Sequence, residues 1–159
     1  MVCLGNICRS PLAEGILKHH AEKAGLNWTI DSAGTSDYHI GEPPHVLSQK
    51  IANHYGLDIS AQQCRQFDKF DMERYDKIYV MDSMNYNDVM KIAGADFDPS
   101  KVDLILNEIY PNETRSVPDP WYGTEEDYHK VYDMLNEACK KIILRYSMLE
   151  VQDITIHYN

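Results

Sequence analysis

Apolar residues recur at helical spacing in four stretches of the chain and form short, nearly continuous runs in three others. The first pattern is typical of helices covered on one face, and the second of strands buried in a sheet. The predicted helices span residues 11–24, 44–55, 83–92 and 125–149, and the predicted strands span residues 28–33, 76–81 and 102–106. Residues 151–159 alternate only weakly and stay unassigned.

Turn and capping residues agree with these boundaries. Pro11 is tolerated in the first turn of a helix, Gly25 follows the end of that helix, and Ser83 is suited to cap a later one. Residues 107–122 contain three prolines and predict a long loop. Strands that alternate with helices indicate an α/β fold in a single domain, residues 1–159, with a mostly parallel sheet covered on both faces.

The composition mainly argues against certain classes of partner and cofactor. No run approaches the roughly 18–20 apolar residues that span a bilayer, so we expect no membrane partner. The net charge of −10 argues against nucleic acid as a partner. No signal peptide is recognisable and the four cysteines form no CxxC pair, which favours reduced thiols and a cytoplasmic location. No histidines or cysteines have the spacing of metal ligands, so we expect no metal or other cofactor.

The strongest chemical signal is a cysteine that is followed, after five residues, by arginine and serine at the start of a predicted helix. The motif reads Cys3-Leu4-Gly5-Asn6-Ile7-Cys8-Arg9-Ser10. Backbone N–H groups in such a loop, with the helix N-terminus behind them, form a nest for an anion. We therefore expect this whole loop to surround a phosphate group, which an acidic protein can hold only through such local donors.

Individual side chains of the motif suit phosphoryl transfer. Gly5 allows the backbone to approach the oxyanion and to adopt positive φ, and Arg9 can hold two phosphate oxygens at once. The same field favours the thiolate of Cys3, which is the nucleophilic form. Ser10 is placed to donate its hydroxyl to the sulfur, and the Asn6 amide can brace the loop. The alternative is a buried structural cysteine before a helix, which does not require the other residues of the motif.

Residues 2–14 (VCLGNICRSPLAE) resemble the active-site loop of the low-molecular-weight protein tyrosine phosphatases. The resemblance continues through residues 31–35, 80–82 and 119–122 and covers nearly the whole chain. It implies a three-layer fold in which helices flank both faces of a central four-stranded parallel sheet. It also implies hydrolysis of phosphotyrosine and other aryl phosphate esters through a phosphocysteine on Cys3.

Cleavage of such an ester requires a proton for the leaving phenolate. Asp119 lies between two prolines, where an aspartate is either an ordinary turn former or a pre-aimed acid. The family resemblance implies that Asp119 is the general acid, and then the base for the attacking water. It also implies that Trp121 and Tyr122 form one wall of a deep cleft and Tyr38 the other. Without the resemblance, the default interpretation of the adjacent Trp121 and Tyr122 is ordinary packing in the core.

Other residues keep two interpretations each. Cys8 is either a small buried loop residue or, as the resemblance implies, a partner for Cys3 in a reversible disulfide. Asp82 either orients groups of the loop or caps the helix beside Ser83. The remaining cysteines, Cys64 and Cys139, are interpreted as structural.

The chain departs from the family pattern at two places. Only Met1 and Val2 precede the cysteine, where the family has a full apolar strand. We therefore expect either that the numbering begins at an internal methionine or that the first strand is a stub. At Gln62 eukaryotic relatives often carry histidine, so no role is carried over to that position.

Three rival functions share parts of this evidence. Arsenate reductase has the same fold and loop, but it relays oxidation through further cysteines, and Cys64 has no partner nearby in sequence. A phosphoarginine phosphatase would use the same loop. A catalytically inactive phosphate-binding module would not need Asp119. The expected partners are therefore phosphotyrosine-containing proteins or peptides, and phosphate or other oxyanions.

Overall fold

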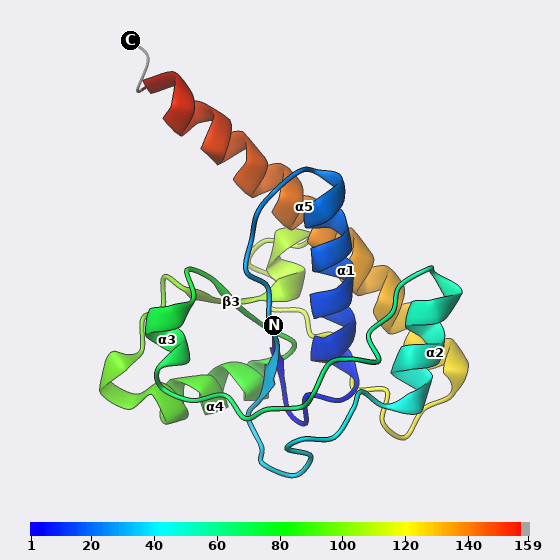
Figure 1. Cartoon of the computed structure of the whole chain (residues 1–159). Coiled ribbons are helices and arrows are strands. Elements are labelled where there is room, and N and C mark those ends of the chain that lie inside the picture. Colours follow the sequence, from blue (N-terminus) through cyan, green and yellow to red (C-terminus); the bar gives the residue numbers. More distant parts are fainter. Residues whose placement is uncertain (157–159) are drawn as a thin grey trace.

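A computed structural model describes residues 1–156 of the chain, with side chains through Met148 (Figure 1). The strands are β1 (Val2–Cys3), β2 (Ala33–Gly34), β3 (Ile78–Val80) and β4 (Val102–Leu104). The helices are α1 (Arg9–Lys23), α2 (Val46–His54), α3 (Asp71–Arg74), α4 (Ser83–Ala93) and α5 (Glu125–Ile156), with short 3-10 turns η1 (Gly94–Asp96) and η2 (Ile105–Glu108).

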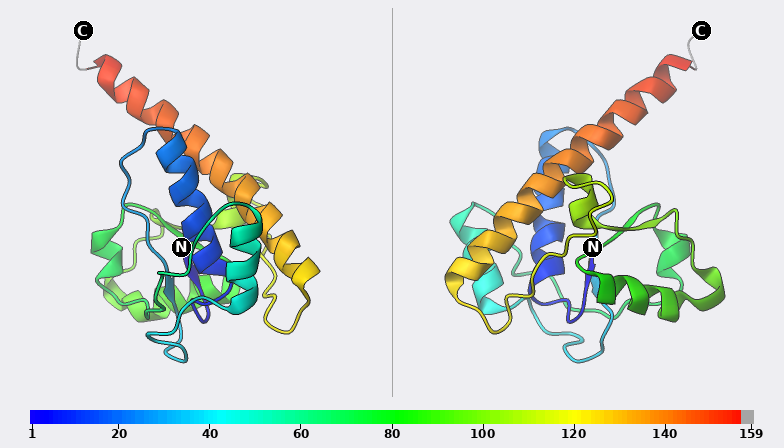
Figure 2. Two further views of the ribbon diagram at one scale, coloured as in Figure 1. Left: turned by 45° about the vertical axis from the view of Figure 1, so that its right-hand side comes forward. Right: turned by 180° about the vertical axis from the view of Figure 1, so that it is seen from behind.

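The four strands form one sheet in the order β2-β1-β3-β4, and all neighbours are parallel. Helices cover both faces, with α1, α2 and α5 on one side and α3 and α4 on the other (Figure 2). The predicted four-stranded parallel sheet flanked by helices is thereby confirmed. Parallel strands end at one edge, where the loops that follow β1 and β3 come together.

Alternate residues of β3 and Met81, which follows it, belong to two separate cores. Tyr79 and Met81 belong to the cluster that α1, α2 and α5 build around Leu12 and Leu135. Ile78 and Val80 belong to the cluster under α3 and α4. This alternation is what a strand buried on both faces requires, and it explains the continuous apolar run that predicted it.

The first two strands each contain two residues. The predicted strand 28–33 is wrong in length, because β2 contains only Ala33 and Gly34. On the side of β1, strand β2 pairs with Val2 and Cys3, which are all the residues of β1. Residues 28–32 precede β2 without a ladder partner among the described residues, so they are not part of the sheet.

Capping and local packing explain the other differences. Asp82, rather than Ser83, is the N-cap of α4, since its carboxylate accepts a hydrogen bond of 2.8 Å from the Asn85 N–H. Helix α1 begins at Arg9, two residues before Pro11. The predicted strand 102–106 ends at Leu104, where η2 starts, and the four-residue helix α3 was not predicted at all.

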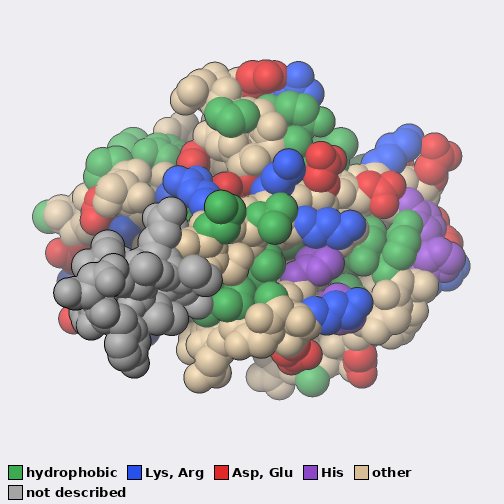
Figure 3. Space-filling view, turned by 90° about the horizontal axis from the view of Figure 1, so that it is seen from above, with side chains coloured by type: hydrophobic (Ala, Val, Ile, Leu, Met, Phe, Trp, Pro, Cys, Tyr) green, Lys and Arg blue, Asp and Glu red, His purple; other side chains and the backbone are tan. Residues whose placement is uncertain are grey.

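Charged side chains of both signs are interspersed on the face of the molecule seen in Figure 3. In the described part of the chain, no helix has both the length and the apolar character needed to cross a bilayer. The last turns of α5 project beyond the body of the molecule (Figure 1).

The end of β2 lies directly against the loop that follows β1. A Cβ atom at Gly34 would stand 2.7 Å from the Leu4 carbonyl oxygen and 3.0 Å from the Asn6 nitrogen. Because these neighbours are backbone atoms, the loop would have to move to make room. Gly34 therefore fixes how closely the strand and the loop can approach.

We predict that Gly34→Ala destabilises the protein by about 1–3 kcal/mol, as overpacking does, and lowers turnover through the displaced loop. Urea unfolding and steady-state kinetics measure both effects. The comparison variant is Gly15→Ala in α1, whose Cβ would stand 2.6 Å from the Cγ2 atom of the buried Ile59. Because this contact lies away from the catalytic loop, Gly15→Ala should lower stability without lowering turnover. A Gly34→Ala variant with unchanged stability and turnover would show that the close approach of β2 to the loop does not matter.

Candidate active site

Cys3 ends β1, and its sulfur lies inside the loop that leads into α1. The Sγ atom is 3.1 Å from the Ser10 hydroxyl oxygen and accepts a hydrogen bond of 3.2 Å from the Asn6 N–H. The residue is 2% exposed. Both neighbours can donate to an anionic sulfur, so the loop is arranged to stabilise a thiolate.

The left-handed position of the loop belongs to Asn6, with φ of 53°, and not to Gly5 as predicted. Asparagine tolerates this conformation better than most residues. At Gly5 the absence of a side chain matters for a different reason, since a Cβ there would lie 3.3 Å from the His39 ring. A side chain at this position would require the His39 ring to shift slightly.

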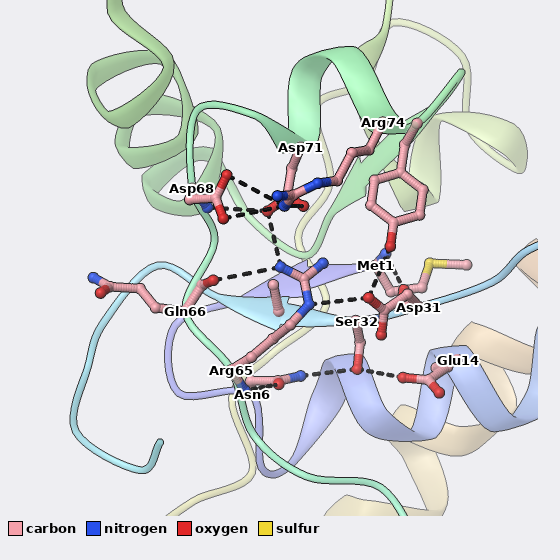
Figure 4. A network of polar contacts seen from close by, with 12 residues as sticks. Met1, Asn6, Glu14, Asp31, Ser32, Arg65, Gln66, Asp68, Asp71 and Arg74 are labelled. Carbon is pink, nitrogen blue, oxygen red and sulfur yellow. Dashed lines mark hydrogen bonds and ion pairs between the residues drawn. The ribbon is translucent and has the colours of Figure 1, made fainter. Parts of the chain in front are cut away.

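The Asn6 side chain holds the loop to three other segments. Its Nδ2 donates to the hydroxyls of Ser10 and Ser32, at 2.8 and 2.9 Å, and its Oδ1 accepts from the Arg65 N–H at 3.0 Å. The Ser32 hydroxyl in turn donates to the buried carboxylate of Glu14 at 2.6 Å (Figure 4). Asn6 therefore braces the loop, and Ser32, Glu14 and Arg65 are supports that the sequence analysis missed.

Arg65 belongs to a larger set of ion pairs beside the loop. Its guanidinium contacts Asp31 at 3.0 Å and the buried Asp71 at 2.9 Å. Tyr75 also donates to Asp31, at 2.8 Å. Burial works against ionisation of Asp31, but the bonds from Tyr75 and Arg65 prevail and lower its pKa. This set fixes the segment whose backbone holds Asn6.

Arg9 is the central cation of the site and is 2% exposed. One terminal nitrogen donates to Asp82 at 2.7 Å and to the Val117 carbonyl at 3.0 Å, and the other donates to Asp119 at 3.1 Å. Burial alone would lower the pKa of Arg9, but Cys3, Asp82 and Asp119 together raise it above its usual value. The arginine is therefore a permanent cation.

One nitrogen of Arg9 has no protein partner. The buried Nε atom makes no hydrogen bond with the residues that the structure describes. A buried N–H without a partner costs free energy unless a ligand satisfies it. An oxyanion held by the Cys3 loop would supply that acceptor.

Asp119 lies at the mouth of the site, on the loop before α5. Its Oδ2 bonds to Arg9, while its Oδ1 accepts from the Trp121 N–H at 3.2 Å. The side chain is 42% exposed, so it can meet both a substrate and water. The structure thus brings two of the predicted catalytic residues, Arg9 and Asp119, into contact, and places Arg9 close enough to Cys3 for that residue to raise the pKa of the guanidinium.

The predicted aromatic walls are only partly assembled. Trp121 packs against the rings of His39 and His45, with centroids 5.6 and 5.4 Å apart. Tyr38 and Tyr122 are exposed, at 73% and 97%, so neither side chain is packed into a wall. The two histidines that support Trp121 were assigned no role from the sequence, where nothing distinguishes them from surface histidines.

The side chains of Ile7 and Cys8 face the core, so only their backbone groups can serve the anion. The Cys8 sulfur is 3.3 Å from the Tyr128 hydroxyl, and burial raises the pKa of its thiol to about 11. Leu4, in contrast, is 40% exposed on the outer side of the loop. Both Cys3 and Cys8 are free thiols, and the disulfide between them stays a prediction.

A thiol, a helix N-terminus and a buried arginine at the carboxyl edge of a parallel sheet define a cysteine-dependent phosphate site. The comparisons agree with this class. Residues 1–153 match the family of low molecular weight phosphotyrosine protein phosphatases, and the chain belongs to that family. Its members are phosphoric ester hydrolases.

Individual relatives match over most of their length. The chain is 35% identical to the low molecular weight protein-tyrosine-phosphatase YfkJ of Bacillus subtilis, over 89% of this chain and 90% of the relative. A protein tyrosine phosphatase from Entamoeba histolytica, with Hepes in the active site, superposes with a TM-score of 0.86 at 32% identity, covering 94% and 96% of the two chains. A drosophila arginine phosphatase superposes with a TM-score of 0.83 at 31% identity, covering 91% and 94%.

The thiols predict a selective chemical modification. Burial raises the pKa of both Cys8 and Cys64 to about 11 and also raises that of Cys139, so all three stay protonated near neutral pH. We predict that iodoacetamide at pH 7.5 alkylates Cys3 first, as mapped by mass spectrometry. Inorganic phosphate should slow this reaction, and modification of Cys8 at an equal rate would be inconsistent with the site.

Proposed function

We propose that this protein hydrolyses phosphotyrosine and other aryl phosphate monoesters through a phosphocysteine intermediate on Cys3. The observation that carries the proposal is the buried Arg9, which bonds to Asp119 and keeps an unpartnered Nε beside the loop that contains the Cys3 sulfur. Anion binding alone would not need an acid beside the arginine. An enzyme that cleaves a phosphate ester needs both the arginine, which binds the anion, and the acid, which protonates the leaving group.

In the first step the phosphate dianion binds to the backbone N–H groups of the Cys3–Ser10 loop and to Arg9. The Cys3 thiolate attacks phosphorus, a sulfur–phosphorus bond forms, and the bond from phosphorus to the phenolic oxygen breaks. Asp119 gives its proton to the leaving oxygen, so that tyrosine leaves as a neutral phenol. The charge that develops on the phosphoryl oxygens is stabilised by donors already in place.

In the second step a water molecule attacks the phosphocysteine. Asp119, now ionised, takes a proton from this water, and the sulfur leaves as a thiolate. The Ser10 hydroxyl, 3.1 Å from the sulfur, donates to the thiolate as it departs. The Asn6 amide orients Ser10 by donating to the same hydroxyl oxygen. The products are inorganic phosphate and the protonated Asp119 needed for the next cycle.

The partners would be phosphotyrosine-containing proteins or peptides, handled by one domain, residues 1–159, in the cytoplasm. Trp121, with Tyr38 and Tyr122 closing over the ligand, would hold a flat phenyl ring. A phosphoarginine substrate would meet the same loop, and one structural relative is an arginine phosphatase. No metal or cofactor enters either step.

The acid role of Asp119 predicts a dependence on the leaving group. We expect Asp119→Asn to slow hydrolysis of a phosphotyrosine peptide by about 10²–10⁴-fold, and to slow p-nitrophenyl phosphate less, because p-nitrophenolate leaves without a proton. Asp96→Asn, on the exposed η1 turn, is the matched control. An equal loss on both substrates would refute the assignment.

Substitution of the nucleophile separates the rival functions. We predict that Cys3→Ser abolishes turnover of every phosphate ester while leaving the fold intact, and that a chelator leaves the wild-type rate unchanged. Rates against matched peptides that carry phosphotyrosine, phosphoserine or phosphoarginine identify the substrate class. Turnover that survives Cys3→Ser would rule out the phosphocysteine mechanism.

A further inference from the structure

The N-cap of α2 is a histidine, His45, which is not among the residue types that most often cap helices. Its side-chain Nδ1 atom accepts a hydrogen bond of 3.2 Å from the Leu47 N–H. Because a backbone N–H group can only donate, Nδ1 must be the acceptor. Serine, aspartate and asparagine perform this role well with smaller side chains. Capping by itself therefore does not explain why an imidazole ring stands at position 45.

The same nitrogen connects α2 with the first turns of α5, which lie beside it (Figure 1). The Tyr128 hydroxyl is 3.2 Å from Nδ1 and donates to it, since Nδ1 already acts as an acceptor. The Tyr128 oxygen can then accept from the Cys8 thiol, whose sulfur is 3.3 Å away. Tyr128 is fully buried, and its ring stacks on that of His45 with centroids 5.6 Å apart. The core thus fixes the orientation of the His45 ring.

The backbone around His45 is attached to the catalytic loop. The His45 N–H donates to the Ile7 carbonyl at 2.8 Å. The Ser48 hydroxyl, in the first turn of α2, donates to the Cys8 carbonyl at 3.1 Å. The start of α2 therefore has a fixed place relative to the loop that contains Cys3.

The His45 ring also packs edge-on against Trp121, with centroids 5.4 Å apart and ring planes inclined by 61°. Trp121 has a second ring neighbour, His39, at 5.6 Å. The side-chain partner of His39 is the exposed Glu42, at 2.8 Å, whereas His45 bonds to the buried Tyr128. His45 is therefore the more firmly held of the two supports of Trp121.

The backbone of Trp121 holds the acid of the proposed reaction. The Trp121 N–H donates to Oδ1 of Asp119 at 3.2 Å, while Oδ2 of the same carboxylate bonds to Arg9. A general acid works only within hydrogen-bond reach of the leaving oxygen, and a small misplacement costs rate. A shift of Trp121 would therefore disturb one of the two contacts that aim the Asp119 side chain.

We propose that His45 is a positioning residue for the general acid: its ring holds Trp121, whose N–H holds the Asp119 carboxylate in place to protonate the leaving phenol. The inference rests on the proposed function, because it gives His45 a part in the acid step of that reaction. An imidazole is needed since one side chain must cap α2, bond to Tyr128 and present a ring to Trp121. Asparagine offers the acceptor without the ring.

Two substitutions at position 45 separate the ring from the cap. His45→Asn keeps a good N-cap but removes the ring, whereas His45→Phe keeps a ring but removes the acceptor. The quantity to measure is kcat/KM, which reports on cleavage of the ester, for a phosphotyrosine peptide and for p-nitrophenyl phosphate. Both substrates contain a phenyl ring, so weaker binding of that ring affects both alike. A misplaced acid slows mainly the peptide, whose phenolate needs a proton.

We expect His45→Asn to lower kcat/KM for the peptide roughly tenfold more than for p-nitrophenyl phosphate. His45→Phe should have a lower melting temperature than His45→Asn, because the Leu47 N–H loses its acceptor, but should keep the wild-type ratio of the two rate constants. The matched control is His54→Asn, at the exposed C-terminal end of α2, which should leave the ratio unchanged. The result for His45→Asn decides the matter even if His45→Phe fails to fold.

A double variant tests the route through Asp119. In the Asp119→Asn background, His45→Asn should have no further effect on the ratio of the two substrates. An unchanged ratio in His45→Asn, an equal loss on both substrates, or full additivity with Asp119→Asn would each overturn the inference. The proposed function would survive these results as long as Asp119→Asn alone slows the peptide selectively. Loss of that selective effect would instead refute the acid role itself.

Discussion

The site depends on one buried cation, the Arg9 guanidinium. Its contacts join segments that are far apart in sequence: Asp82 after β3, and Val117 and Asp119 on the loop before α5. A buried guanidinium is tolerated only when its donors are paired, so these segments are held at fixed positions around it. The remaining Nε atom has no hydrogen-bond partner among the described residues and is free to donate to a bound oxyanion. The interaction that organises the loops therefore also creates the demand for an oxyanion.

A second set of contacts holds the loop itself. Asn6 links Ser10, Ser32 and the Arg65 backbone, and Glu14 completes the chain of hydrogen bonds from α1. These side-chain contacts act on the loop. They keep the N–H groups of the loop aimed at one point, so that the phosphate meets donors that need no rearrangement.

Much of this arrangement could be predicted from the sequence, because the motif is local and its chemistry is specific. The order of Cys3, Arg9 and Ser10 before a helix indicated the loop, and the apolar run at 76–81 indicated a buried strand. The sequence left open whether Asp82 orients the loop or caps a helix, and the structure shows that it does both. The contact of Asn6 with Ser32 could not be predicted, since it joins positions whose spacing carries no pattern. The predicted length of β2 was wrong because the length of a strand depends on the strand with which it pairs. The partner here, β1, pairs with β2 through only two residues.

The family assignment and the catalytic geometry both lead to the conclusion that the Cys3 sulfur carries the phosphoryl group between substrate and water. Rapid quenching of a single turnover with a phosphotyrosine peptide, followed by mass spectrometry of the fragments, tests it directly. We predict one phosphoryl group on the Cys3 fragment in the wild type, with a larger amount in Asp119→Asn when p-nitrophenyl phosphate is the substrate. Phosphate released with no covalent enzyme species at any time, or phosphorylation of a residue other than Cys3, would contradict the account.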